Sequence, residues 1–333
     1  MYLHALGHFH PPNLLTNAFF EELGLETSDA WIVDRVGIRT RHTVLPLDYL
    51  RETRNRDVRA AQEAALFSNA ETGRRAALMA LERAGLKPSD IGLVVAGGCS
   101  PDECIPAESN RVAQLLNIQA PAVDLQSACS SFCMQLHFLA GMRPERLPDY
   151  VLVVNMDNST RVVDYTDRSS AVLWGDGASA AILSPRVPGR WQLTETLLAG
   201  DPSGADKVRV PRMGHFTQNG GEVQKFAIRR AGRRSRPCER ASWSVTRTRA
   251  RGPSPSSGTR PTCACWRPCS GGVWCRTRGT SSMCTPGEHR RRRRAGVLSE
   301  HWDDPAVGDA VVLSVVGSGL TWAGALLERT PAR

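Results

Sequence analysis

The sequence predicts an α/β fold in which strands and helices alternate along the chain. Two observations predict it: most expected strands are near-continuous apolar runs, as in sheets covered on both faces, and helical patterns separate them. A third observation interrupts the fold, because neither pattern is present between Phe226 and Gly296. With 333 residues, the chain is long enough for about two domains.

The first 42 residues predict a strand and two helical segments. Residues 1–7 are apolar enough for a first edge strand, and residues 17–23 suggest a short helix. The segment from Trp31 to His42 is typical of a helix start, a break at Gly37 and a basic extended stretch.

Clearer signals follow up to residue 116. Residues 71–84 are strong helix formers with an apolar face and stop at Gly85. Residues 90–97 form an apolar run that predicts a buried strand, and residues 106–116 predict another helix.

The rest of the chain repeats this alternation. Residues 150–156 predict a strand, residues 172–183 a glycine turn and a strand, and residues 191–198 alternate as a strand should. A last strand at 311–316 is followed by a glycine turn and a second apolar run at 320–327.

The chemistry is centred on the stretch from Asp124 to Phe132. Residues 122–125 predict a short buried strand, and a helical pattern over 130–142 puts Phe132, Leu136, Leu139 and Ala140 on one face. Cys129 is therefore expected at a strand-to-helix junction, where unsatisfied N–H groups and the helix dipole favour a thiolate. A lone cysteine is more often a buried structural residue, so the surrounding motifs decide its role.

Composition predicts a soluble cytoplasmic protein. No apolar run approaches the roughly 20 residues that span a bilayer, and residues 1–13 lack the pattern of a signal peptide. The ten cysteines are then expected as thiols rather than as a disulfide framework.

The net charge of +9 comes from one segment. Residues 231–294 contain sixteen arginines and two acidic residues, a net charge of +14, whereas the rest of the chain carries 26 basic and 31 acidic residues. The segment also holds six of the ten cysteines and has no Leu, Ile, Phe or Tyr. Such a composition cannot bury enough apolar surface to offset the entropy of ordering.

Four motifs in order resemble the beta-ketoacyl-ACP synthase III family of the thiolase superfamily. They are Trp31–Arg41, similar to Trp-Ile-x-x-Arg-x-Gly-Ile-x-x-Arg; Ala128–Phe132, similar to the nucleophile motif; Leu173–Ala178, similar to Phe-Gly-Asp-Gly-Ala; and Gly317–Trp322, similar to Gly-x-Gly-x-Thr-Trp. The resemblance covers residues 1–230 and 296–330.

The resemblance implies a thiolase-like fold of two pseudo-repeated βαβαβ halves in layered α/β/α/β/α arrangement. We expect the halves at residues 1–170, with the nucleophile, and 171–333, disrupted at about 231–294. The active site then lies between them, and a homodimer is expected.

The resemblance also implies the chemistry. Cys129 takes an acyl group from acyl-CoA as a thioester, and malonyl-ACP or another acyl carrier is decarboxylated to a carbanion that attacks it. Backbone groups of Cys129, Gly317, Ser318 and Gly319 are the candidates for binding the oxyanion. Trp31 and Arg35 match positions that contact CoA, although a partly buried Trp and a solvated Arg explain them equally simply. No cofactor, metal, nucleic acid or membrane is implied.

Two family motifs are missing. The His of a His-Gln-Ala-Asn motif and the Asn of a Gly-Asn-Thr motif belong between Phe226 and Gly296, and neither motif occurs in the chain.

Both motifs appear when the segment is read in another frame. With GC-rich codons, Gly258–Gly272 shifted by one base reads His-Gln-Ala-Asn-Leu-Arg-Val-Leu-Glu-Ala-Val-Leu-Arg-Arg, and Gly287–Arg290 in the other shifted frame reads Gly-Asn-Thr-Gly. We therefore interpret residues 231–294 as an out-of-frame translation, with the frame restored near Ala295.

Other interpretations of these residues are weaker. Arg290–Arg294 is basic enough for a nucleic-acid or membrane patch, and Cys263, Cys265 and Cys269 offer thiolates for zinc but lack a suitably spaced fourth ligand. His301 lies outside the motif context and is expected at the surface. Neither Gly-x-Gly stretch follows the dinucleotide pattern.

Three functions remain open at this stage. The first is decarboxylative condensation to a beta-ketoacyl thioester, in fatty-acid initiation or, as the Ser130-Ser131 pair favours, in a specialised pathway. The second is an acyltransferase of the same fold that makes an ester or amide without decarboxylation. The third is an inactive homologue, because His and Asn are absent as written.

Sequencing the coding DNA across residues 225–300 tests the frameshift hypothesis. We expect insertions or deletions whose correction restores His-Gln-Ala-Asn and Gly-Asn-Thr. A clean read that encodes the same arginine-rich protein contradicts a sequencing error.

Overall fold

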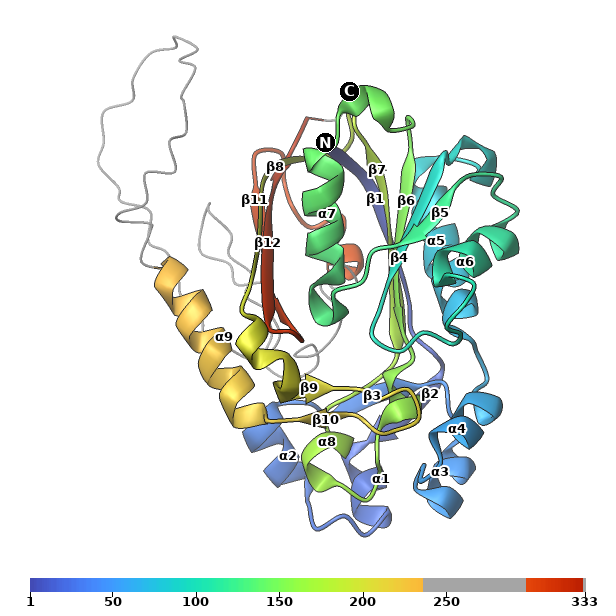
Figure 1. Ribbon diagram of the computed structural model, residues 1–333, viewed down its shortest axis with the longest axis vertical. Helices are drawn as coiled ribbons and strands as arrows, with labels where there is room; N and C mark the ends of the chain where they lie inside the picture. The colour runs from blue at the N-terminus through green and yellow to red at the C-terminus, as the bar shows by residue number, and fades with distance from the viewer. Residues whose placement is uncertain (236–297, 332–333) are drawn as a thin grey trace.

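A sheet of eight strands in the order β11-β12-β8-β1-β7-β6-β4-β5 organises the computed structural model (Figure 1). The structure describes residues 1–235 and 298–331, with the backbone alone described at 228–235. Its strands are β1 Tyr2–Phe9, β4 Leu93–Gly97, β5 Ala122–Asp124, β6 Val151–Asp157, β7 Gly177–Ser184, β8 Trp191–Gly200, β11 Ala310–Gly317 and β12 Thr321–Arg329. Two small sheets add β2 Asn13–Thr16 with β3 Thr40–Thr43, and β9 Val208–Arg209 with β10 Thr217–Gln218.

Helices cover the faces of the sheet and the end of it that lies at the bottom of Figure 1. They are α1 Asn17–Glu22, α2 Asp29–Val36, α3 Leu47–Thr53, α4 Val58–Ala64, α5 Asn69–Ala84, α6 Glu108–Leu116, α7 Ser131–Gly141, α8 Arg168–Ala171 and α9 Gly220–Ser235, with short 3-10 turns η1 Pro88–Asp90, η2 Ala128–Ser130, η3 Pro144–Arg146, η4 Ser159–Val162 and η5 Pro202–Lys207. In the part of the chain that the structure describes, no helix combines the length and apolar character needed to cross a membrane.

Strand direction changes along the sheet. β4 pairs in parallel with β5 and β6, whereas the pairs from β6 through β7, β1, β8 and β12 to β11 are antiparallel. The carboxyl ends of β4, β5 and β6 therefore point the same way, and loops that follow them share one edge.

Helix α7 lies between two parts of this sheet (Figure 1). It contacts β8, β11 and β12 on one side and β4 and β6 on the other. Because it is covered on both sides, Phe132, Cys133, Leu136 and Leu139 join one core cluster with strand residues of both parts. A helix that is apolar nearly all round is typical of such a central position.

A second core lies on the opposite face of the parallel strands. Helix α5 contacts β1, β6 and β7, and α6 contacts β4 and β5. Ser68 caps α5 and forms a capping box with Glu71, and Gly85 ends the helix in a left-handed conformation at φ 66°. The predicted helix and its stop at Gly85 are confirmed.

The approach of α5 to β1 depends on a glycine. A Cβ added at Gly7 would lie 2.0 Å from the carbonyl oxygen of Ala76 and 2.7 Å from the backbone nitrogen of Ala80. Only glycine lets helix and strand backbones come this close.

Two expectations about strand position are wrong. The first strand is not an edge strand, because β1 lies between β7 and β8. The strand before the nucleophile is not buried, because β5 is the last strand of the sheet and Val123 is 45% exposed. Short apolar runs do not specify how many neighbours a strand has. Ala140 is also exposed rather than on the buried face of α7.

Candidate functional site

Cys129 lies in a tight turn at the start of α7. The chain leaves β5 at Asp124, passes through η2 and enters α7 at Ser131. Ala128, directly before the cysteine, is left-handed with φ 46°, a conformation that L-residues adopt at a cost of about 1–2 kcal/mol. Cys129 thus lies at the predicted strand-to-helix junction, and the sharp reversal leaves it exposed.

Side chains within the turn hold its shape. Ser131 Oγ accepts from the backbone N of Ser127 at 2.9 Å and donates to the carbonyl of Ala128 at 2.7 Å. Ser130 Oγ donates to the carbonyl of Ser127 at 2.7 Å. Ser130 and Ser131 are 0% and 2% exposed, so both hydroxyls serve the turn from inside.

The predicted oxyanion residues lie at the β11–β12 turn, against this nucleophile turn. η2 contacts β11 and β12, and a Cβ added at Gly317 would lie 2.9 Å from the carbonyl oxygen of Ser127. Ser318 Oγ donates to the carbonyl of Val208 at 2.7 Å, which holds the turn from its other side. The structure thus brings the turn of Cys129 together with Gly317, over a separation of nearly 190 residues.

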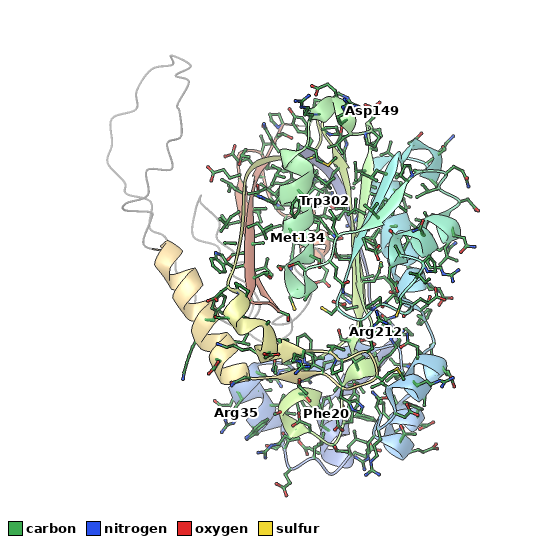
Figure 2. The ribbon with its side chains drawn as sticks, in the orientation of Figure 1. Phe20, Arg35, Met134, Asp149, Arg212 and Trp302 are labelled. Carbon is green, nitrogen blue, oxygen red and sulfur yellow. The ribbon has the colours of Figure 1, made fainter. Side chains whose placement is uncertain are left out.

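Trp31 and Arg35 lie on α2, whose N-cap Ser28 and left-handed Gly37 explain its start and end. The guanidinium carbon of Arg35 is 4.9 Å from the centre of the Trp31 ring, and that of Arg168 is 4.8 Å away. Both arginines are exposed. Figure 2 places Arg35 at the lower left, apart from Met134 of the central helix. One indole with two cations presents a surface suited to a nucleotide with phosphates.

The Gly175-Asp176-Gly177 turn is a structural junction. Asp176 accepts from the backbone of Val44 at 2.7 Å and from the backbone of Thr160 at 2.8 Å. Complete burial raises the pKa of Asp176 to about 6, although these hydrogen bonds act in the opposite direction. The carboxylate therefore joins the start of β7 to β3 and η4.

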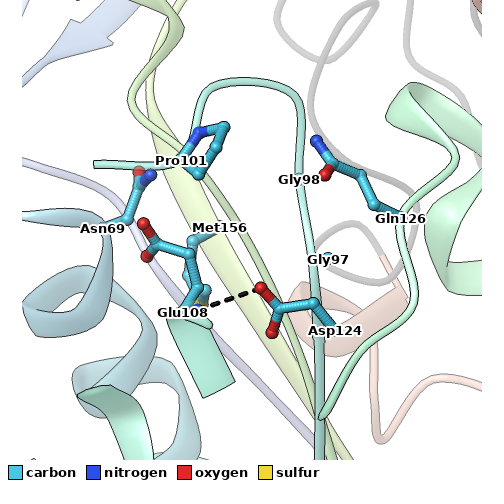
Figure 3. Close-up of a pocket in the computed structure, with 8 residues that line it drawn as sticks. All are labelled: Asn69, Gly97, Gly98, Pro101, Glu108, Asp124, Gln126 and Met156. Carbon is cyan, nitrogen blue, oxygen red and sulfur yellow. Dashed lines mark hydrogen bonds between the residues drawn. The ribbon is translucent and has the colours of Figure 1, made fainter. Parts of the chain in front are cut away.

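A buried acid lines a pocket beside the strand that leads to Cys129 (Figure 3). The small pocket is lined by Asn69, Gly97, Gly98, Pro101, Glu108, Asp124, Gln126 and Met156. Asp124 accepts from the backbone of Glu108 at 2.9 Å and of Ser109 at 3.0 Å, and so caps α6. Glu108 accepts from the backbone of Asp102 at 2.5 Å, and its other oxygen has no hydrogen-bond partner among the described residues.

Burial, reinforced by the negative charge of Asp102, raises the pKa of Glu108 to about 7. Asp102 contacts the guanidinium of the buried Arg161, whose positive charge lowers the pKa of Glu108 and so acts in the opposite direction. The carboxyl of Glu108 is thus held largely as the neutral acid below pH 7.

Several residues of this arrangement escaped the sequence-based reasoning. Arg168 was missed, although an Asp-Arg pair just before the Gly-Asp-Gly turn was a usable signal. Thr321 lies in the Gly317–Trp322 motif, but its contact with Ser130 gave no signal, because 191 residues separate the two. Glu108 gave none either, since its burial follows from tertiary packing.

Other predicted features lie outside the described residues. These are the out-of-frame segment 231–294 apart from the end of α9, the shifted-frame motifs, Arg290–Arg294, and Cys263, Cys265 and Cys269. His301 is described, and its Nδ1 lies 2.7 Å from Asp304 in a surface pair. Within residues 1–235 and 298–331, no three His, Cys, Asp or Glu side chains converge as metal ligands would.

Known proteins resemble this chain in sequence. A family model for 3-oxoacyl-[acyl-carrier-protein (ACP)] synthase III matches residues 123–202. The beta-ketoacyl-[acyl-carrier-protein] synthase III of Geobacillus kaustophilus is 32% identical over 232 residues, which cover 69% of this chain and 67% of that protein. The protein of the same name from a Sulfurovum species is 28% identical over 349 residues, covering 97% and 94%.

Solved structures resemble it in fold. The 3-oxoacyl-[acyl-carrier-protein] synthase III of Aquifex aeolicus matches with a TM-score of 0.73 at 22% identity, covering 98% of this chain and 99% of that one. The priming beta-ketosynthase of the R1128 polyketide pathway matches with a TM-score of 0.70 at 22% identity, covering 99% and 97%. These likenesses confirm the predicted α/β, thiolase-like fold class.

The buried acid predicts a pH-dependent stability. Because the pKa of Glu108 is raised from 4.5 to about 7 in the folded protein, its contribution is fully present below pH 4.5 and is lost as pH rises through 7. The free energy of unfolding of Glu108→Gln lacks this pH dependence. From pH 5 to pH 8, we therefore expect it to rise by about 2–3 kcal/mol relative to that of the wild type, as measured by urea unfolding. The exposed Glu52→Gln is the matched control. A pH-independent difference between Glu108→Gln and the wild type contradicts the prediction.

Proposed function

Because this chain belongs to the beta-ketoacyl-ACP synthase III family, we propose that it is an acyl-thioester condensing enzyme that takes an acyl group onto Cys129. The observation that carries the proposal is the exposed cysteine at the start of a buried central helix, in a turn packed against the glycine turn of β11 and β12. We also propose that the chain divides into two halves, residues 1–170, which contain the nucleophile, and residues 171–333.

The first step needs a thiolate and oxyanion donors. The Cys129 sulfur attacks the carbonyl carbon of an acyl thioester, and the carbonyl oxygen becomes an oxyanion in the tetrahedral intermediate. Collapse expels the thiolate of the donor and leaves the acyl group on Cys129. The N-terminus of an eleven-residue helix favours the attacking thiolate. Backbone N–H groups of Cys129 and of the Gly317–Gly319 turn are the proposed oxyanion donors.

The second step is decarboxylative condensation. Malonyl-ACP, or another malonyl carrier, loses CO₂; its carbanion attacks the acyl carbon, and the Cys129 thiolate leaves. The family motifs with His and Asn that stabilise this carbanion are absent from the written sequence. That absence favours a second candidate function for the chain as written, in which Cys129 is acylated but does not condense.

Acyl-CoA is the proposed donor. A purine can stack on the Trp31 ring if it displaces one of the two guanidiniums that lie near that ring. Arg35 and Arg168 offer positive charge to the phosphates. We propose a cytoplasmic location, where thiols such as Cys129 are kept reduced.

A homodimer is the proposed assembly. The outer edge of β5 has no neighbouring strand in the described sheet, and Val123 on it is 45% exposed. Ile105, next to α6, which packs on β5, is 84% exposed. If β5 pairs with β5 of a second copy about a two-fold axis, the backbone groups on its outer edge form hydrogen bonds and this apolar surface is covered.

Incubation with acyl-CoA and intact-protein mass spectrometry test the proposed nucleophile. We expect one acyl adduct on the wild type and none on Cys129→Ala, while Cys104→Ala, which removes another exposed thiol, keeps the adduct. A wild type without an adduct, or an adduct that survives in Cys129→Ala, refutes the proposal.

The same acylation assay tests donor binding. Arg168→Ala should raise the half-saturating concentration of acyl-CoA about tenfold. It should leave the half-saturating concentration of an acyl-pantetheine donor, which lacks the nucleotide, unchanged.

Release of CO₂ from malonyl-ACP tests condensation. It should occur with the frame-corrected protein and not with the chain as written. Release by the chain as written refutes the second candidate function.

Sedimentation velocity tests the dimer. We expect the wild type to sediment as a dimer and Val123→Asp as a monomer, because a charge on each copy repels across the two-fold axis. Val307→Asp, at a site 55% exposed but away from this edge, should remain dimeric. A monomeric wild type, or a dimeric Val123→Asp variant, contradicts this interface.

A further inference from the structure

Three hydroxyl groups join the nucleophile turn to the β11–β12 turn. Ser130 Oγ lies 2.6 Å from Thr321 Oγ1 and 2.8 Å from Ser127 Oγ. Ser127 Oγ and Thr321 Oγ1 are 3.3 Å apart. Ser130 is wholly buried, whereas Ser127 and Thr321 are half-buried. We call these three side chains the hydroxyl cluster.

Thr321 Oγ1 lies 2.6 Å from Ser130 Oγ but 3.3 Å from the carbonyl of Ser318, and the shorter contact favours an arrangement of the hydrogens centred on Ser130. Ser130 Oγ donates its single hydrogen to the carbonyl of Ser127 at 2.7 Å. Its two lone pairs then accept from Thr321 Oγ1 and from Ser127 Oγ, which fills the capacity of a hydroxyl group. Ser130 is therefore the centre of the cluster, and loss of Thr321 Oγ1 leaves a buried acceptor unfilled.

The cluster lies directly against Gly317, where the β11–β12 turn begins. A Cβ at Gly317 would lie 2.7 Å from Ser130 Oγ and 2.9 Å from Thr321 Oγ1. Gly317 and Thr321 face each other in the register that closes the β11–β12 hairpin. Thr321 thus ties the base of this hairpin to the residue that follows Cys129.

We infer that the hydroxyl cluster holds the backbone of Cys129 at a fixed position relative to the Ser318–Gly319 backbone, so that Ser130 and Thr321 are positioning residues for acylation. The inference rests on the proposed function. Cys129 lies between Ser127 and Ser130. Ser127 Oγ bonds to Ser130 Oγ, and Ser130 Oγ bonds to Thr321 Oγ1, so the two sets of candidate oxyanion donors are connected through Ser130. A shift of about 1 Å between reacting groups costs on the order of 100-fold in rate.

The test compares acylation with simple alkylation of the same thiol. Acylation requires a carbonyl oxygen to be stabilised, whereas iodoacetamide alkylation of Cys129, followed in its own peptide by mass spectrometry, requires the thiolate but no oxyanion donors. Thr321→Val removes the hydroxyl and keeps the branched shape. Thr321→Ser keeps the hydroxyl, and Thr194→Val, on the neighbouring strand β8, is the matched control.

For Thr321→Val we expect the maximal acylation rate to fall about tenfold. The half-saturating acyl-CoA concentration and the alkylation rate should stay within about twofold of the wild type. Thr321→Ser should recover most of the loss, and Thr194→Val should behave as the wild type. If Thr321→Val does not fold, Ser130→Ala, which removes the central hydroxyl without adding bulk, is expected to show the same selective loss.

Two outcomes overturn the inference alone. One is an acylation rate within twofold of the wild type in Thr321→Val and Ser130→Ala. The other is an alkylation rate that falls in parallel with the acylation rate in these two variants, which indicates a general disturbance of the turn. A wild type that takes up no acyl group overturns the proposed function, and this inference with it.

Discussion

The packing of α7 on both sides is the interaction on which the rest of the structure depends. One helix contacts β4 and β6 on one side and β8, β11 and β12 on the other. Each large apolar side chain buried there contributes about 1.5–3 kcal/mol, and Phe132, Leu136 and Leu139 belong to one core with both sets of strands. The helix therefore cannot move relative to either part of the sheet without opening that core, and the turn at its start is fixed with it.

The polar groups around the site divide into two kinds. Those near Cys129 are hydroxyls that bond among themselves and to backbone carbonyls, with no formal charge. Those beside β5 are carboxyls, of which Asp124 caps a helix, Asp102 contacts Arg161 and Glu108 has a pKa raised to about 7. The turn that carries Cys129 is thus held by neutral hydroxyl groups, whereas the neighbouring edge of the parallel strands holds the carboxyls.

Much of the element order followed from the sequence, because it rests on local signals. Gly37 and Gly85 ended helices where predicted, and the junction at Cys129 was correctly placed between a strand and a helix. Sheet position was mispredicted for residues 1–7 and 122–125, since neighbours in a sheet are set by tertiary contacts. The meeting of Ser130 with Thr321 and the burial of Glu108 depend on the same long-range packing, so no window of sequence contains them.

The central place of β1 has a consequence for synthesis of the chain. This strand is made well before its partners β7 and β8, which begin only at Gly177 and Trp191. At roughly 5–20 residues per second, an apolar strand waits on the order of 10–40 s on the ribosome before its neighbours exist. The nascent chain thus spends that interval with β1 unpaired, and the described sheet is complete only after β12, which ends at Arg329, has been translated.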